Sequence, residues 1–138
     1  MAQTPNSRLS SPSTIHAPRG YSHVAEVTKG KLIYIAGQVA LDKNGNLVGK
    51  DDFAAQVRQV FSNLAAALES AGANFHDVIK LNYYCADSVD PAAGLPAVRT
   101  IRDEFLNRAA PPVSTFVVVR RLVQPDWLIE VEAVAVVD

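Results

Sequence analysis

Between residues 52 and 71, apolar side chains recur every three or four positions. The residues that share this spacing are Phe53, Val57, Val60, Phe61, Leu64 and Leu68. The spacing predicts an amphipathic α-helix with one buried face. Asp51 and Asp52 can cap its N-terminus, and Gly72 follows as a C-terminal stop. A helix of this length needs a second layer of structure against its apolar face.

β-Favouring segments surround this helix. Residues 22–27 and 32–36 precede it and are separated by a stretch that contains Gly30, a pattern that predicts a hairpin. Residues 78–86 follow it directly. Two further segments, residues 115–121 and 128–137, close the chain.

A second helix is predicted to begin at Pro91, because proline suits the first turn of a helix. Its apolar face consists of Leu95, Val98, Ile101 and Phe105. The predicted order is therefore ββαβαββ. This order indicates an α+β fold in which two helices cover one face of a mixed sheet.

The face of the sheet without helices is predicted to need a partner. Residues 116–119 are apolar on both sides, and residues 129–135 alternate apolar side chains with acids. A sheet face that is apolar yet left uncovered by helices implies contact with another subunit.

Length and charge limit the classes of function. The chain has 138 residues, enough for one domain, which we place at residues 19–138. Residues 1–18 are rich in Ser, Thr, Pro and Asn and are predicted to be a flexible N-terminal segment. The 13 basic and 14 acidic residues give a net charge of −1, so we expect no nucleic acid as a partner.

The remaining signals point to a cytoplasmic protein without a cofactor. Cys85 is the single cysteine, which excludes an internal disulfide, and its apolar neighbours favour an inert buried thiol. No apolar run approaches the roughly 20 residues of a membrane span, and no signal peptide is apparent. No spacing of His, Cys or acids resembles a metal site, and no phosphate-binding loop is present.

Several motifs together resemble the YjgF/RidA family, also called endoribonuclease L-PSP-like. They occur in the family's order and spacing: Gly20-Tyr21-Ser22, Ile35-Ala36-Gly37-Gln38, Gln56 to Leu64, Leu68 to Ala73, and Ile129 to Ala135. The similarity runs from about Tyr21 to Val136. The resemblance implies a chorismate-mutase-like α+β fold and a homotrimer with its sheets inward. It also implies small-molecule ligands in three clefts between subunits. For the reactive intermediate deaminase branch it implies hydrolysis of enamines and imines to ketoacids and ammonia.

One position departs from the deaminase branch. Where that branch carries an arginine that clamps the substrate carboxylate, the segment Pro111-Pro112-Val113-Ser114-Thr115 places Val113. Loss of a charge-assisted pair of this kind costs about 2–5 kcal/mol of binding. We therefore expect a less anionic or more apolar ligand.

The other site residues follow from the same resemblance. Glu130 matches the catalytic carboxylate that positions or activates water, although a solvated strand acid is the alternative. Tyr21 matches a pocket-lining tyrosine, and the alternative is an aromatic that packs at a strand edge. Ser114 and Thr115 follow the lost arginine and can offer backbone contacts. Arg99 lies where relatives carry an asparagine, so it either supplies the missing positive charge or is a solvated helix arginine.

Two interpretations of function stay open at this point. One is a hydrolase of C=N substrates with altered specificity. The other is a non-catalytic small-metabolite-binding protein on the same trimeric fold. A ribonuclease is disfavoured by the near-neutral charge and the lack of an evident histidine pair.

Overall fold

The computed structural model describes residues 2–3 and 6–138. Within these residues the chain forms seven strands, two α-helices and one short 3-10 helix. In chain order they are β1 (Ala2–Gln3), β2 (Ser7–Ser10), β3 (Val24–Val27), β4 (Lys31–Gln38), α1 (Phe53–Ser70), η1 (Phe75–Asp77), β5 (Val78–Ala86), α2 (Pro91–Phe105), β6 (Val113–Val119) and β7 (Ile129–Val137).

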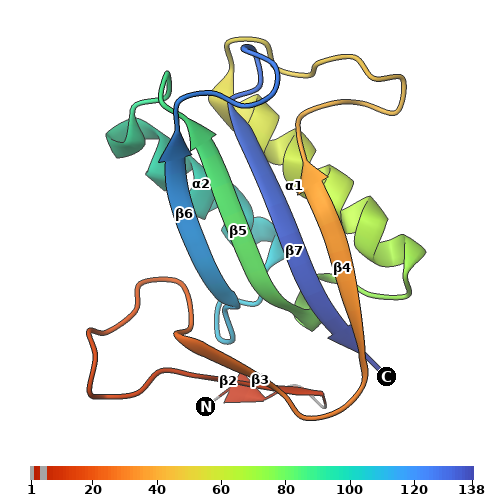
Figure 1. The fold of residues 1–138 in the computed structure, drawn as a ribbon, viewed down its shortest axis with the longest axis vertical. Helices are drawn as coiled ribbons and strands as arrows, with labels where there is room; N and C mark the ends of the chain where they lie inside the picture. The colour runs from red at the N-terminus through yellow and green to blue at the C-terminus, as the bar shows by residue number, and fades with distance from the viewer. Residues whose placement is uncertain (1, 4–5) are drawn as a thin grey trace.

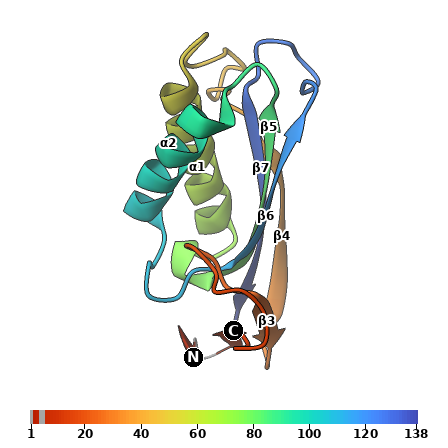
Figure 2. The ribbon, with the colours of Figure 1, turned by 90° about the vertical axis from the view of Figure 1, so that its left-hand side faces the viewer.

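A four-stranded mixed sheet forms the centre of the molecule, in the order β4-β7-β5-β6 (Figure 1). β5 and β6 run parallel, whereas β7 is antiparallel to both β4 and β5. Both α-helices lie on the same face of this sheet, and the other face is bare of helices (Figure 2). The predicted α+β fold, with two helices on one face of a mixed sheet, is confirmed.

The core lies between α1 and the sheet. Five residues on the predicted apolar face of α1 are fully buried: Val57, Val60, Phe61, Leu64 and Leu68. They pack with the inward side chains of β7, which are Ile129, Val131, Ala133 and Ala135. The side chain of Asp52 accepts the backbone N–H of Ala55 and caps the helix, as predicted. Gly72 follows the helix with φ +72°, a conformation that costs glycine little.

The predicted second helix and the strand before it are confirmed. The strand spans Val78–Ala86, and the helix begins at Pro91 behind the capping side chain of Asp90. The two closing strands exist but begin at other residues than predicted, at Val113 and Ile129. The first of them is shifted because Val113 already pairs with Lys80 of β5.

The predicted hairpin between residues 22–27 and 32–36 is wrong. β3 pairs with β2, and β4 pairs with β7, so the two segments belong to different sheets. Gly30, at φ +98°, turns the chain between them, and a Cβ there would collide with the backbone oxygen of Val137. β4 takes β7 as its partner because this pairing brings Ile33 and Ile35 to the helix-covered core.

The division into residues 1–18 and 19–138 stays a prediction. Part of the first segment lies outside the described residues. Within the described part, β2 pairs with β3, and Asn6 and Ser7 are buried. In the chain as described, Ser7–Ser10 therefore belongs to a small sheet beneath the main one (Figure 1).

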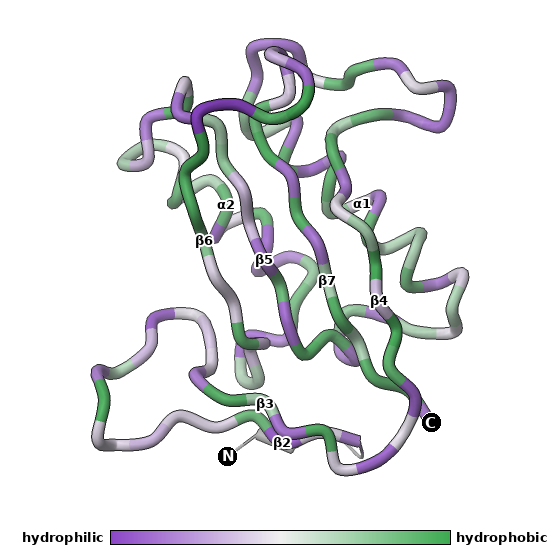
Figure 3. Tube along the Cα trace, in the orientation of Figure 1, coloured by the Kyte–Doolittle hydropathy of each residue, from purple (hydrophilic) through white to green (hydrophobic). Residues whose placement is uncertain are grey.

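The uncovered face of the main sheet mixes apolar and acidic side chains. Hydrophobic and hydrophilic positions alternate along β7 (Figure 3), and Glu130 and Glu132 lie opposite its buried residues. Tyr34 of β4 is 75% exposed there. Leu32 and Val117 are also exposed large apolar residues. Among the described residues, neither helix has the length and apolar character needed to cross a membrane.

Candidate functional site

A segment of the chain, residues 16–23, crosses the start of β6 and is fixed there by Ser22. We call this segment the N-terminal strap. The hydroxyl of Ser22 donates to the carbonyl of Pro111 at 2.6 Å, and its backbone N–H donates to the carbonyl of Pro112 at 3.2 Å. Ser22 also forms a parallel bridge with Val113. The strap is therefore held against the strand that carries Val113 and Ser114.

Within the strap, three rings orient one another. The Nε2 atom of His16 and the hydroxyl of Tyr21 share a hydrogen bond of 2.8 Å. The Nε2 of His23 lies 2.9 Å from the backbone oxygen of His16. The ring of His23 also contacts those of His16 and Tyr21 edge-on, at 4.8 Å and 5.3 Å. Tyr21 is thus held in one orientation by the strap itself.

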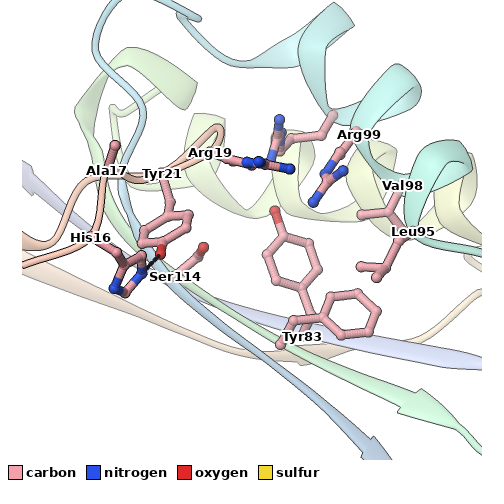
Figure 4. Close-up of a pocket in the computed structure, with 11 residues that line it drawn as sticks. His16, Ala17, Arg19, Tyr21, Tyr83, Leu95, Val98, Arg99 and Ser114 are labelled. Atoms are coloured by element: carbon pink, nitrogen blue, oxygen red, sulfur yellow. Dashed lines mark hydrogen bonds between the residues drawn. The ribbon is translucent and has the colours of Figure 1, made fainter. Parts of the chain in front are cut away.

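The strap closes one side of a cavity of about 430 Å³. The other walls come from α2 and from the inward side of β5 and β6 (Figure 4). Its apolar wall consists of Leu95, Val98 and Phe116. Its charged wall consists of Arg19, Arg99 and Arg102, and none of the described acidic residues lines it. The cavity therefore combines an apolar surface with a strongly cationic one.

The three arginines are held differently. Arg102 donates from Nε and Nη2 to Oδ1 of Asp103, at 3.1 and 2.9 Å. Its guanidinium also lies against Gly20, where a Cβ would come within 2.8 Å of Nη2. Gly20 has φ +75°, a backbone conformation that favours glycine. Within the described residues Arg19 and Arg99 make no ion pair or side-chain hydrogen bond.

Tyr83 of β5 places a hydroxyl inside this cavity. The residue is 3% exposed, and its ring stacks on Phe116 with centroids 5.6 Å apart. Its hydroxyl has no hydrogen-bond acceptor among the described residues, and it points toward Arg19 and Arg99 (Figure 4). Burial raises the pKa of Tyr83 strongly, and the nearby charge of Arg102 opposes this rise. The group is therefore a neutral donor at physiological pH.

The structure brings three of the six predicted site residues together. Tyr21, Arg99 and Ser114 all line the cavity. Val113 instead points to the uncovered face, where it borders a shallow hollow with Lys80 and His23. Thr115 lies two positions further along β6 and shares the face of Val113, because side chains alternate along a strand.

Glu130 lies apart from the cavity residues and also apart from Val113 and Thr115. It is on the uncovered face of β7, opposite Tyr84 of β5. Its carboxylate packs over Gly37, whose missing side chain leaves the room for it. It lines a hollow of about 360 Å³ together with Arg121 and Glu132. A single chain therefore does not bring Glu130 to Tyr21 and Arg99.

Next to Glu130, Glu132 accepts hydrogen bonds from Nδ2 of Asn82 at 2.9 Å and from the hydroxyl of Tyr84 at 2.7 Å. These donors, Asn82 first, lower the pKa of Glu132. The same contact raises the pKa of Tyr84. Glu132 is thus held ionised by its neighbours and is not free to take up protons in a reaction near neutral pH.

Sequence analysis missed Arg19, Arg102 and Tyr83 as members of a site. The signal for Arg102 was present, since it follows Arg99 by three positions and so shares a helix face with it. Tyr83 lies two positions from the buried Leu81 and from the buried Cys85, so it shares their core-facing side of the strand. Arg19 had no such signal, because the strap reaches the cavity only through tertiary contacts. Burial raises the pKa of the Cys85 thiol to about 11, which fits the prediction of an inert cysteine.

Among residues 2–3 and 6–138, no three His, Cys, Asp or Glu side chains lie close enough together to hold an ion. The chemistry available is that of guanidinium groups, hydroxyls, imidazoles and carboxylates.

This α+β chain, with a cavity at the edge of its sheet, can be assigned to a family by comparison with known sequences. Residues 12–137 match the family described as endoribonuclease L-PSP. The chain belongs to this family, which is also called YjgF/RidA.

Individual relatives agree with this assignment. A RutC family protein of Pyrococcus horikoshii is 35% identical over 123 residues, which are 88% of this chain and 93% of the relative. The 3-aminoacrylate deaminase RutC of Acinetobacter baylyi is 30% identical, over 82% of this chain and 85% of its own. A crystal structure of a Rid family protein of unknown function from Yersinia pestis superposes with a TM-score of 0.84 and 37% identity. It covers 96% of this chain and 99% of its own.

Proposed function

We propose that this protein is a homotrimer that binds small molecules in clefts between subunits. In these clefts it hydrolyses an enamine- or imine-type C=N substrate, with a specificity altered by Val113. The proposal extends the activity named for the 3-aminoacrylate deaminase relative to this chain. Its site residues are Glu130 as the catalytic carboxylate and Tyr21, Val113, Ser114, Thr115 and Arg99 as ligand contacts.

The separation of Glu130 from the other predicted site residues carries the proposal. Glu130 and Val113 lie on the uncovered face, whereas Tyr21, Arg99 and Ser114 line a cavity on the helix side. A site that uses both groups needs a second copy of the chain to supply one of them. The exposed apolar side chains on the uncovered face, Tyr34 above all, favour burial against such a copy.

In this mechanism Glu130 accepts a proton from a water molecule as the water adds to the carbon of the C=N bond. Glu130 returns this proton to the nitrogen, which gives the carbinolamine. Glu130 then takes the hydroxyl proton of the carbinolamine and passes it to the nitrogen as the C–N bond breaks, so that ammonia leaves and a carbonyl compound remains. Val113 can make apolar contact with the substrate but cannot pair with a carboxylate. The substrate is therefore less anionic at this end than an amino-acid-derived imine.

Two measurements test the proposal together. Light scattering at micromolar concentration should give the mass of three 14.8 kDa chains. Imines generated in place from a small amino acid, and from the corresponding amine without a carboxylate, should be hydrolysed unequally, with the neutral imine preferred. Glu130→Gln should abolish that hydrolysis without changing the mass. A stable monomer, or equal activity of Glu130→Gln, would contradict the proposal.

Val113→Arg tests the specificity directly. If Val113 faces the substrate, the new guanidinium should raise affinity for small ketoacids by at least about tenfold, since charge-assisted pairs are worth several kcal/mol. Without ligand the arginine lies beside Lys80, so we expect a loss of about 1–3 kcal/mol in stability. Thermal shift with and without pyruvate measures both effects. A variant that gains no more from pyruvate than the wild type would place Val113 outside the cleft.

A non-catalytic small-metabolite-binding protein is the second candidate, and the replacement of the arginine by Val113 is the observation that favours it. It predicts that the cleft binds ligand while Glu130→Gln changes neither binding nor any C=N hydrolysis above the uncatalysed rate.

A further inference from the structure

We propose that His16 is a positioning residue for the C=N hydrolysis described above. It directs the hydroxyl of Tyr21 toward the ligand, and His23 in turn holds His16 in place. This role rests on the proposed function, in which Tyr21 is a ligand contact. His16 belongs to the segment predicted to be flexible, so part of that N-terminal segment then belongs to the site.

The hydrogen bond between His16 and Tyr21 is the first argument. Nε2 of His16 lies 2.8 Å from the hydroxyl of Tyr21, and both side chains line the cavity (Figure 4). A phenol can both donate and accept a hydrogen bond. If Nε2 accepts the proton of Tyr21, the phenol oxygen offers lone pairs to a ligand, and if Nε2 donates, the phenol keeps its proton for the ligand. In either tautomer His16 decides what Tyr21 can offer.

The second argument is that His16 is itself held. A carbonyl oxygen only accepts hydrogen bonds, so the 2.9 Å contact between Nε2 of His23 and the backbone oxygen of His16 requires a proton on that nitrogen. The two imidazole rings also meet edge-on, with centroids 4.8 Å apart. The backbone N–H of His23 donates to Oγ of Ser11 at 3.2 Å, which ties His23 to the chain before the strap. His23 therefore fixes both the backbone and the ring of His16.

The ring of Tyr21 is fixed by its neighbours as well. Ser22, the next residue, is bound to the carbonyls of Pro111 and Pro112. The ring of His23 packs edge-on against that of Tyr21, with centroids 5.3 Å apart. The backbone and ring of Tyr21 are thus set by Ser22 and His23, and the direction of its hydroxyl is set by His16.

Solvent exposure determines how this role should appear in an experiment. His16 is exposed, so water competes for its hydrogen bond with Tyr21, and this bond adds little to the stability of the fold. Its effect falls on the orientation of a group that meets the ligand, where a small misplacement lowers the rate. Loss of His16 should therefore reduce turnover and leave the melting temperature unchanged.

The test follows hydrolysis of the neutral imine made from a small amine. His16→Phe keeps a planar ring without the polar atoms and should lower kcat/KM about threefold to tenfold. His16→Gln, whose amide can both donate and accept, should stay within about twofold of the wild type. The matched control His76→Phe alters an exposed histidine outside the cavity and should have no effect. Equal losses in His16→Phe and His16→Gln, or no loss in His16→Phe, would overturn the role.

A double variant separates positioning from a general structural role. If His16 acts through Tyr21, His16→Phe should cost nothing further in a Tyr21→Phe background, because the two residues share one interaction. Nitrogen NMR gives a second readout: Tyr21→Phe should shift the Nε2 resonance of His16 and leave that of His76 in place. Losses that multiply in the double variant, or an unshifted His16 resonance, would contradict positioning through Tyr21.

Failure of this role can be told from failure of the proposed function. A wild-type protein that hydrolyses no imine contradicts both. Hydrolysis that Glu130→Gln abolishes but His16→Phe leaves unchanged contradicts only the role of His16.

Discussion

The two faces of the central sheet are built from the same strands but differ in burial and in polar contacts. On the helix-covered face, side chains such as Phe61 and Val131 are fully buried, and an arginine-lined cavity lies beside α2. On the uncovered face, Tyr34 is 75% exposed, and Glu132 is bound by Asn82 and Tyr84. In β6 two consecutive residues lie on different faces: Val113 is on the uncovered face and Ser114 is on the covered face. The covered face therefore supplies most of the buried core, whereas the uncovered face exposes apolar and acidic side chains.

Core truncation on the covered face should have the largest effect. Phe61 is fully buried and its ring packs with Phe75, Phe105 and Tyr83. Phe61→Ala should therefore lower the free energy of unfolding by about 3–5 kcal/mol, measured by urea denaturation. Tyr34→Ala, on the uncovered face, should change the stability of a single chain by less than about 0.5 kcal/mol.

The same pair of variants also tests what the uncovered face does. If this face packs against another copy, Tyr34→Ala should lower the mass measured by light scattering at equal protein concentration. If Tyr34→Ala instead destabilises as strongly as Phe61→Ala without any change of mass, the two faces do not differ in the way described.

Loosening the strap should have an intermediate effect. Ser22→Ala removes the 2.6 Å hydrogen bond to the Pro111 carbonyl and leaves a part-buried acceptor without its partner. We expect a loss of about 1 kcal/mol in the free energy of unfolding. Amide exchange should speed up most in residues 16–23, and in α1 only by the several-fold that a loss of about 1 kcal/mol implies. Uniform acceleration throughout the chain would show that the strap is an integral part of the core.

The smallest effect is a pH dependence from the uncovered face. Hydrogen bonds from Asn82 and Tyr84 lower the pKa of Glu132 below its ordinary 4.5. The unfolded chain therefore binds a proton at higher pH than the folded one. The ionised carboxylate of Glu132 therefore stabilises the folded state. This stabilisation is fully present above about pH 4.5 and is lost as the pH falls through the lowered pKa of the folded state.

Glu132→Gln should thus flatten the fall of stability with pH below about pH 4.5. Asn82→Ala should flatten it more than Tyr84→Phe, because Asn82 is the larger cause of the shift. Chemical denaturation at several pH values between about 3 and 6 measures the slopes. Unchanged slopes in all three variants would show that this network does not hold Glu132 ionised.

Local patterns in the sequence were enough to predict most of the fold. The spacing of Phe61, Leu64 and Leu68 determines the buried face of α1, and Asp52 and Gly72 determine its ends. The alternation of Ile129, Glu130 and Val131 correctly separated the two faces of β7. The hairpin failed because strand pairing is a long-range choice. A glycine between two β segments does not say whether they pair with each other or with strands elsewhere in the chain.

The candidate site was less accessible to sequence analysis. Resemblance to the family led to Tyr21, Arg99 and Ser114, and the structure brings these three together. It did not lead to Arg19 or Tyr83. Arg19 directly follows residues 1–18, whose composition resembles disorder, and a tyrosine among apolar strand residues looks like any core aromatic.

What the sequence by itself determined was therefore the periodic part of the molecule: its helices, most of its strands, its family and the face on which each strand residue lies. These follow from local backbone geometry, in which a side chain's direction is set by its neighbours in the chain. Tertiary structure alone decided that the strap crosses β6 and that Arg19, Arg99 and Arg102 surround the buried hydroxyl of Tyr83. It also decided that Glu130 lies apart from this cavity. These spatial relations depend on the packing of segments that are far apart in sequence, and local backbone geometry does not determine them.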